Sequence, residues 1–235
     1  MNTSMKTALA AIAVLMVFSC KKENINRQLP IHDYEPTNIV AGKYAHVKIG
    51  TQVWMIKNLD VTHYRNGDRI PQVKDSAKWA NLTTGAWCWY KNDSANGAVY
   101  GKLYNWYAVT DPRGLAPTGW HVPTDAEWDT LSKFLGGNSV AGGKLKETGT
   151  VQDGTGLWYA PNTGATNMSG FTGLPGGYRA TNGAYYFLSR YGFWWSSTEA
   201  TANGAWGRSL TYNFPDFYRK IFDKQDGFSI RCIRD

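Results

Sequence analysis

The sequence contains few residues of the kinds that build common catalytic centres. Its four histidines are dispersed along the chain: His32, His46, His63 and His121. None has a partner at the spacing of an HxxxH metal motif, and His121, in the segment GWHVP, is predicted to be a packed or capping residue. No GxSxG motif, Walker-type phosphate loop or strand-linked GxGxxG motif occurs. We therefore expect no enzyme activity, no cofactor and no metal ion.

Clusters of basic residues and long apolar runs are also scarce. The 25 lysines and arginines exceed the 18 acidic residues, which gives a formal net charge of +7, but they are scattered singly. No basic stripe results, so a nucleic-acid partner is not expected. The apolar run at residues 8–18 is too short to span about 30 Å of hydrocarbon at about 1.5 Å per residue. Its length is typical of the core of a secretory signal.

This run ends in Val17-Phe18-Ser19-Cys20, where a small residue directly precedes a cysteine. The segment resembles the lipobox of bacterial lipoproteins, which implies cleavage after residue 19 and lipid attachment to Cys20. We expect residues 1–19 to be a signal peptide and residues 20–43 a lipidated, flexible tether. The lipid then anchors the protein in the outer membrane, at the cell surface or the periplasmic face. The alternatives are an ordinary signal peptide with a chance cysteine, or a buried apolar helix.

Aromatic residues and glycine are abundant, with 11 Trp, 14 Tyr and 25 Gly. Aromatic residues favour strands and packed interfaces, glycine favours turns, and disordered chains lack such aromatic content. No internal repeat is present, so residues 44–235 are predicted to form one folded, loop-rich domain. The residue pattern predicts five strands: His46–Gly50, Thr51–Ile56, Phe193–Ser197, Ala205–Tyr212 and Phe228–Ile233. The segment Asn66-Gly67-Asp68 predicts a turn.

Two helices are predicted. The first spans Tyr100–Val109, where apolar residues recur at helical spacing. The second begins after Thr124, which forms a capping-box pattern with Glu127, and ends at the glycine pair that starts with Gly136. Three acidic residues near its start are expected to serve the helix terminus rather than catalysis: Asp125, Glu127 and Asp129. No strong helix is expected in residues 136–192.

Seven segments resemble, in order, the Fibrobacter succinogenes major paralogous domain, which is common in lipoproteins of Bacteroidota and Fibrobacteres. They cover nearly the whole chain after the tether: Val47–Leu59, Trp87–Asp93, Tyr100–Trp106, Pro117–Trp128, Gly170–Arg179, Trp194–Glu199 and Gly227–Asp235. Any one segment alone is a weak signal, but seven collinear segments are specific.

The PTDAEW and GFSIRC segments are also similar to the formylglycine-generating enzyme group, whose fold is C-type-lectin-like. This similarity implies an α+β domain with two helices, a small twisted antiparallel sheet whose terminal strands pair, and long loops rich in aromatic residues and glycine. The enzyme group works through a redox-active cysteine pair that binds copper, and no second thiol precedes Cys232 nearby. That activity is not expected, and the calcium-binding EPN, QPD and WND triplets of true C-type lectins are absent as well.

Once Cys20 is lipidated, Cys88 and Cys232 are the two remaining cysteines. In an oxidising compartment they are expected to form one disulfide, with two buried free thiols as the alternative. Many members of the family that the chain resembles carry a second cysteine pair at the places of Gly97 and Ala116. Because both are absent here, the resemblance also implies that Cys88 pairs with Cys232.

The expected function is that of a noncatalytic binding module of the cell envelope, with a glycan or an envelope protein as its partner. Ring faces beside amide and hydroxyl groups suit sugars and protein hot spots alike. The candidate ligand-binding residues are Trp158, Tyr159, Tyr185, Tyr186, Phe187, Tyr191 and Glu199. The aromatic residues could instead form a core beneath the loops, and Glu199 could be a buried hydrogen-bond acceptor. The alternative functions are an enzyme acting on envelope glycans and a structural subunit of a surface complex.

Overall fold

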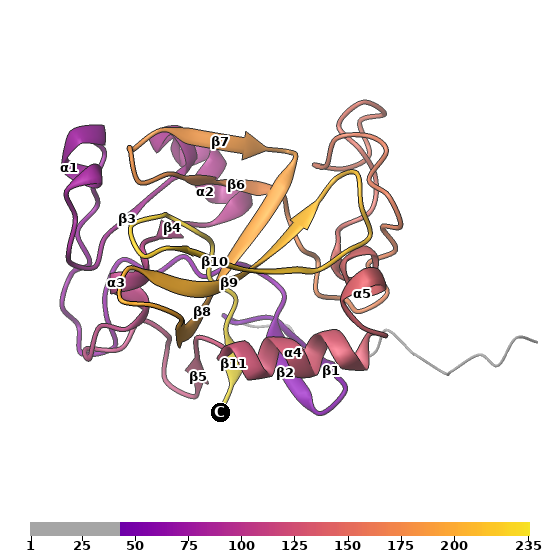
Figure 1. Cartoon of the computed structure of the whole chain (residues 1–235), viewed down its shortest axis with the longest axis horizontal. Helices are drawn as coiled ribbons and strands as arrows, with labels where there is room; N and C mark the ends of the chain where they lie inside the picture. The colour runs from indigo at the N-terminus through magenta and orange to yellow at the C-terminus, as the bar shows by residue number, and fades with distance from the viewer. Residues whose placement is uncertain (1–42) are drawn as a thin grey trace, which may run out of the picture. The chain divides into compact units, whose positions relative to one another are not determined.

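The computed structural model describes residues 43–235 (Figure 1). The predicted signal peptide, the lipidated Cys20 and the tether up to residue 42 lie outside the described residues. Within residues 43–235, none of the helices combines the length and the apolar character that a membrane span needs.

The described chain is a mixed α+β fold, as predicted, with more helices than the two expected. The helices are α1 (Ser76–Ala80), α2 (Ser94–Tyr100), α3 (Trp106–Val109), α4 (Asp125–Phe134), α5 (Asn138–Leu145) and the 3₁₀ turn η1 (Tyr90–Asn92). The first strands are β1 (His46–Ile49), β2 (Gln52–Met55), β3 (Trp87–Cys88), β4 (Leu103–Tyr104) and β5 (Trp120–His121). The remaining strands are β6 (Gly176–Arg179), β7 (Tyr185–Leu188), β8 (Tyr191–Glu199), β9 (Gly204–Thr211), β10 (Tyr218–Asp223) and β11 (Ile233–Arg234).

The largest sheet has five strands in the order β10-β9-β8-β6-β7 (Figure 1). Adjacent strands in this sheet are antiparallel, except that β6 and β8 run parallel to each other. Because side chains alternate along a strand, Tyr191, Phe193 and Trp195 of β8 share one face, which we call the front. Trp194 lies on the other face, which we call the back, and its cross-strand neighbour is Arg208 of β9. Both faces of this sheet are covered at its centre.

A second sheet joins the two ends of the described chain in the order β1-β2-β11-β5. The predicted β1–β2 hairpin forms, and its turn residue Gly50 has a φ of 62°. A side chain at Gly50 would also lie only 2.9 Å from the ring of Phe134, so glycine serves both the turn and the close packing. Ile233 of the last strand pairs with Trp54 on one side and His121 on the other. The N-terminal hairpin and the last strand therefore lie in one sheet, with β11 beside β2 and not beside the first strand, β1.

Helix α4 forms where the capping box predicted it. The hydroxyl of Thr124 accepts the backbone N–H of Glu127 at 3.2 Å, and the Glu127 carboxylate accepts the N–H of Thr124 at 2.7 Å. Its apolar face is fully buried at Trp128 and Leu131. These side chains share a core cluster with Trp54 of the small sheet and Trp194 on the back of the large sheet. Burying each such side chain stabilises the fold by about 1.5–3 kcal/mol.

The helix predicted over residues 100–109 does not form as one helix. Helix α2 ends at Tyr100 because Gly101, with φ 76° and ψ −156°, leaves the helical region. Leu103 and Tyr104 then form β4, which pairs with β3. A new helix, α3, starts after Asn105, whose side chain accepts the N–H of Ala108 at 3.2 Å. Strand pairing and a second cap therefore override the helical spacing of the apolar residues.

Helix α5 lies in the region where no strong helix was predicted. Its two interior glycines, Gly142 and Gly143, reduce the sequence signal because glycine is a poor helix former. The structure requires both of them. A side-chain carbon at Gly142 would lie 2.1 Å from the carbonyl oxygen of Asp216, and one at Gly143 would lie 2.3 Å from that of Gly164. The helix can approach these loops only without side chains at both positions.

The predicted strand at residues 228–233 is extended but has no continuous partner. Phe228 bonds to Tyr104, and the N–H of Ser229 donates to the carbonyl of Phe193. Farther on, the carbonyl of Ile230 accepts the N–H of Leu59 at 2.8 Å. Only β11 at its end joins a sheet. The strand pattern was correct about burial and wrong about pairing, because successive residues bond to different elements.

Three buried cations hold the long loops by binding backbone carbonyls. The ammonium of Lys146 donates to the carbonyls of Thr163, Thr211 and Phe214 at 2.8–3.1 Å. Burial lowers the pKa of Lys146 to about 8. Two arginines also donate to loop carbonyls. The carbonyls that Arg179 binds are those of Val73, Lys74 and Gly183. The carbonyls that Arg231 binds are those of Met55, Phe171 and Thr172. Loops that lack regular hydrogen bonding satisfy their carbonyls through these side chains.

The predicted disulfide is not formed, since Cys88 and Cys232 are both free and buried. They belong to different core clusters: Cys88 packs with Trp79 and Leu103, whereas Cys232 packs in the larger cluster that contains Tyr104. Burial raises the pKa of Cys88 to about 11 and that of Cys232 to about 12. The alternative of two buried thiols is the one that the structure contains.

Candidate functional site

A groove on the front of the five-stranded sheet combines ring faces with polar groups. We call it the aromatic groove; it has a volume of about 270 Å³ and is lined by Tyr178, Phe187, Tyr191, Phe193, Ser209, Lys220, Phe222 and Asp226. A larger hollow of about 330 Å³ follows residues 43–61, but a single aromatic side chain, Tyr44, lines it. Binding sites for small molecules are lined by aromatic residues and a few convergent polar groups. The aromatic groove is therefore the stronger candidate.

The rings of the groove form a continuous series. Tyr191 and Phe193, two residues apart on β8, stack with their centroids 5.6 Å apart and their planes 10° apart. Phe187 of β7 lies 4.8 Å from Tyr191, and Tyr178 of β6 lies 5.0 Å from Phe193. Phe222 of β10 meets Phe193 edge to face at 5.7 Å. The sheet order thus brings rings from four strands together, including both edge strands.

The rings range from buried to exposed. Phe193 is buried, Tyr178, Tyr191 and Phe222 are half-buried, and Phe187 is 44% exposed. Phe187 also has a φ of 63°, which places a non-glycine residue in the left-handed region at this edge. A ligand can therefore reach ring faces while the floor of the groove remains part of the core.

Three polar side chains line the groove. Ser209 supplies a hydroxyl, Lys220 an ammonium and Asp226 a carboxyl group. The carboxyl of Asp226 accepts the N–H of Thr181 at 3.1 Å. Burial, with a smaller contribution from the negative charge of Asp223, raises the pKa of Asp226 to about 7. The groove therefore contains a carboxyl group that changes charge near neutral pH.

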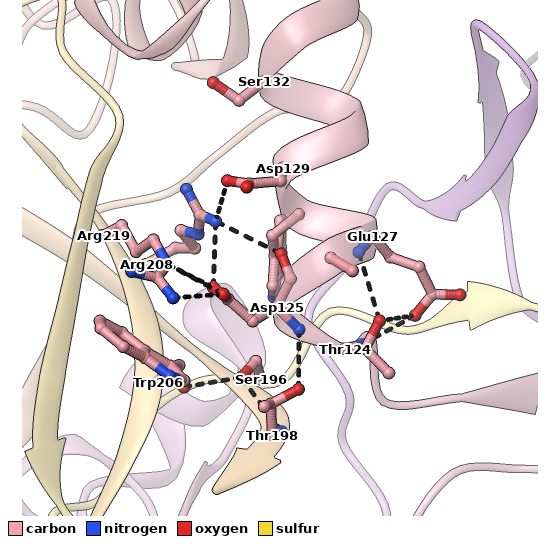
Figure 2. Close-up of polar contacts among 12 residues, drawn as sticks. Thr124, Asp125, Glu127, Asp129, Ser132, Ser196, Thr198, Trp206, Arg208 and Arg219 are labelled. Carbon is pink, nitrogen blue, oxygen red and sulfur yellow. Dashed lines mark hydrogen bonds and ion pairs between the residues drawn. The ribbon is translucent and has the colours of Figure 1, made fainter. Parts of the chain in front are cut away.

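The back of the same sheet is fixed to α4 by paired charges (Figure 2). Asp125 contacts Arg208 at 3.0 Å and Arg219 at 2.7 Å, and Asp129 contacts Arg208 at 2.7 Å. The guanidinium of Arg219 lies 3.3 Å from the ring centroid of Trp206. The hydrogen bond from Arg208 lowers the pKa of Asp129. Asp125 and Asp129 thus bind arginines of the sheet, while Glu127 alone of the three predicted carboxylates serves the capping box.

The family model of the Fibrobacter succinogenes major domain matches residues 47–234. The chain belongs to this family. The match includes every residue that lines the aromatic groove. No curated protein and no solved structure matches the chain.

The predicted ligand residues of this Fibrobacter succinogenes major domain fall into separate places. Tyr186 and Tyr191 lie at the groove: Tyr191 lines it, and Tyr186 is 39% exposed, 6.1 Å from Phe187. Tyr185 packs elsewhere, with its ring 5.3 Å from that of Tyr90 and its hydroxyl bonded to Asn92 at 3.0 Å. The structure therefore brings together two of the predicted tyrosines with Phe187.

Two of the predicted residues belong to the region around α5. Trp158 is fully buried, and its indole N–H donates to the carbonyl of Gly173 at 3.0 Å. It also lies beneath the ammonium of Lys146, so the structure places this predicted residue in the core, which was the alternative for the loop aromatics. Tyr159 is half-buried against Tyr212. Neither residue lines the groove.

Glu199 and His121 both have charged partners in the described chain. Glu199 is exposed at the end of β8 and pairs with Lys224 at 2.7 Å. His121 lies between Glu127 and Asp235, with both contacts at 2.8 Å. It therefore links Glu127 of the capping box to Asp235. Within residues 43–235, no group of three or more histidine, cysteine or acidic side chains could hold a metal ion.

Six residues that line the groove were not predicted as ligand residues: Tyr178, Phe193, Ser209, Lys220, Phe222 and Asp226. For two of these residues a signal was available, because Tyr218, Lys220 and Phe222 alternate as one face of a strand does. Tyr178 was visible only as part of a family segment. Asp226 has no local signal, since several of its neighbours lie far away in sequence, such as Thr181, which donates to its carboxyl group, and Tyr178 and Tyr191, which line the same groove.

Proposed function

We propose that this protein is a noncatalytic binding module of the cell envelope that holds a glycan in the aromatic groove. The observation that supports this proposal is the exposed face of Phe187 beside half-buried tyrosines and three polar side chains. A sugar ring stacks its C–H face on an aromatic ring while its hydroxyl groups bond to polar neighbours. Ser209, Lys220 and Asp226 offer such neighbours within one groove.

We further propose that the module is anchored in the outer membrane through a lipid on Cys20 and has a C-type-lectin-like fold. The lipobox-like segment before Cys20 supports the anchor. The terminal strands that share one sheet, together with the long loops, support the fold. Replacing Cys20 by serine should move the protein from the detergent-rich phase to the aqueous phase in a phase-separation assay. A Cys20→Ser protein that remains with the detergent would contradict lipid anchoring.

A glycan array with the purified protein tests binding. We expect the wild type to bind a subset of glycans and Phe187→Ala to lose most of that binding, because the exposed ring makes the stacking contact. The matched control is Phe214→Ala, which removes a ring that is 50% exposed and outside the groove. Loss of binding in both variants, or in neither, would contradict the assignment of the groove. Binding to an envelope protein instead of any glycan would favour the protein-partner alternative.

A glycosidase is the second candidate, and Asp226 is the reason to consider it. A carboxyl group with a pKa near 7 can act as a general acid at neutral pH. Glycosidases, however, use two carboxyl groups across the scissile bond, and one carboxyl lines this groove. Release of reducing sugar from a bound glycan by the wild type, but not by Asp226→Asn, would establish this alternative over the noncatalytic module.

A further inference from the structure

Asp226 is a carboxyl group in the aromatic groove that has no cationic partner. Its side chain accepts a hydrogen bond from the backbone of Thr181, and the residue is 8% exposed. Among the ion pairs formed within residues 43–235, none includes Asp226. A buried carboxylate is costly unless a positive charge compensates it. A cationic ligand would therefore bind beside Asp226 with a more favourable free energy than a neutral ligand.

The rings around Asp226 favour the same kind of ligand. The faces of aromatic rings attract cations at distances within about 6 Å of the ring centroid. Tyr178, Phe187 and Tyr191 offer such faces, and Phe193 closes the floor. A buried carboxyl group that lines one groove with several rings suits the binding of a protonated amine.

We propose that the aromatic groove recognises an amino sugar, with the protonated amine on Asp226 and the sugar ring on Phe187 and Tyr191. This inference rests on the proposed glycan binding and names the class of sugar. The groove, about 270 Å³ in volume, lies just below the range of about 300–1,000 Å³ that holds drug-sized ligands, so it suits one ring of a longer glycan. Ser209 and Lys220 can form hydrogen bonds with the hydroxyl groups of a sugar. A lysine of a protein ligand would also bring an amine, but its methylene chain has no hydroxyl groups for these two residues.

The charged and titratable groups around Asp226 come from three elements. Asp223, on the same turn, adds negative charge, and Tyr178 on β6 has a pKa raised by burial and by Asp226. Lys220 on β10 also lines the groove, with its ammonium 5.6 Å from the ring centroid of Tyr218. Because the pKa of Asp226 is about 7, protonation at lower pH removes the charge that binds the amine. Binding of the cationic sugar should weaken as pH falls below about 7.

Isothermal titration calorimetry of the purified protein with two trimers tests the inference. One is a trimer of glucosamine, which carries free amines, and the other is a trimer of N-acetylglucosamine, which has none. At pH 7 we expect the wild type to prefer the free amine by about tenfold or more, as for a hydrogen bond to a charged group. Asp226→Asn should remove this preference. Asp223→Asn, an exposed acidic residue on the same turn and outside the groove, should keep it.

The results separate failure of the inference from failure of the proposed function. Equal affinity for both trimers, with loss of both in Phe187→Ala, would overturn the amine preference and leave glycan binding intact. A preference that persists in Asp226→Asn would also overturn it, because the amine would then bind elsewhere. Asp226-dependent binding of trilysine in place of either trimer would assign the groove to a protein amine. If no trimer binds, the inference fails, and the glycan array decides separately whether glycan binding fails.

Discussion

The two faces of the five-stranded sheet differ in the environment of their acidic side chains. On the back, Asp125 and Asp129 each contact an arginine of the sheet, and the pKa of Asp129 is lowered by Arg208. On the front, Asp226 lines a groove with aromatic rings and forms no ion pair within residues 43–235, and burial raises its pKa to about 7. The paired acids fix a helix to the sheet, whereas the unpaired acid remains available for a ligand. This difference is why we propose the front as the ligand-binding face.

The largest expected effect comes from breaking the pairs on the back. Arg208→Met should lower the free energy of unfolding by about 3–5 kcal/mol, because it leaves Asp125 and Asp129 without their buried partner. Urea unfolding measures this loss. The matched control is Arg219→Met, which removes a partly exposed partner and should cost less than about 1 kcal/mol. Equal costs for the two variants would contradict the role of burial.

On the front, replacing the unpaired acid should stabilise the protein. The pKa of Asp226 is raised from 3.8 to about 7, so the folded state holds a proton that the unfolded state releases between these values. The stability that this proton provides is present below pH 4 and is lost as pH rises through about 7. Asp226→Asn should remove this decline and raise the unfolding free energy at pH 8 by up to about 4 kcal/mol. Urea unfolding at pH 4–8 tests this, and a steeper decline in the variant would refute it.

A smaller effect on stability is expected at His121, which forms partly exposed ion pairs with Glu127 and Asp235. Partial burial acts to lower its pKa, but hydrogen bonds to Glu127 and Asp235 outweigh burial and raise it. Its pairs should therefore stabilise the protein below pH 6.5 and lose that contribution as pH rises past the folded-state pKa. Since the histidine is partly exposed, His121→Gln should cost less than about 1 kcal/mol at pH 5.5 and nothing at pH 9. Thermal unfolding at both pH values is the measurement.

The two thiols should show almost no chemical reactivity in the folded protein. Like Asp226 they are acids whose ionised forms are disfavoured by burial, with pKa values of about 11 and 12 for Cys88 and Cys232. In a Cys20→Ser protein, alkylation without reductant should modify neither thiol natively and both in denaturant. A count of zero in denaturant would show that the two cysteines form a disulfide after all.

Parts of the fold with a strong local signal could be predicted. The capping box located α4, and the Gly50 turn located the β1–β2 hairpin. The failures occurred where long-range contacts compete with local preference. Tyr100–Val109 has helical spacing but is divided by the pairing of β4 with β3. Helix α5 was missed because its glycines, which weaken the helix signal, are required by loops distant in sequence.

The candidate site shows the same division. Phe187 and Tyr191 could be named from sequence because aromatic residues are abundant in the loops, but Tyr178 and Asp226 were missed and Trp158 is a core residue. Exposure is a property of the packed molecule, and local composition does not determine it. Trp158, which is buried beneath Lys146, and Phe187, which is exposed on the edge strand β7, both occur in aromatic-rich loop segments, and the sequence does not show which of them is exposed.

The sequence by itself determined the family, the α+β class and the main helix cap, since each depends on collinear motifs or on neighbours within four residues. The tertiary structure alone decided which rings meet, that Cys88 and Cys232 stay apart, and that Asp226 is buried with no ion pair in the part of the chain that the structure describes. Packing brings together residues from distant strands, and the resulting loss of water changes the chemistry of Asp226.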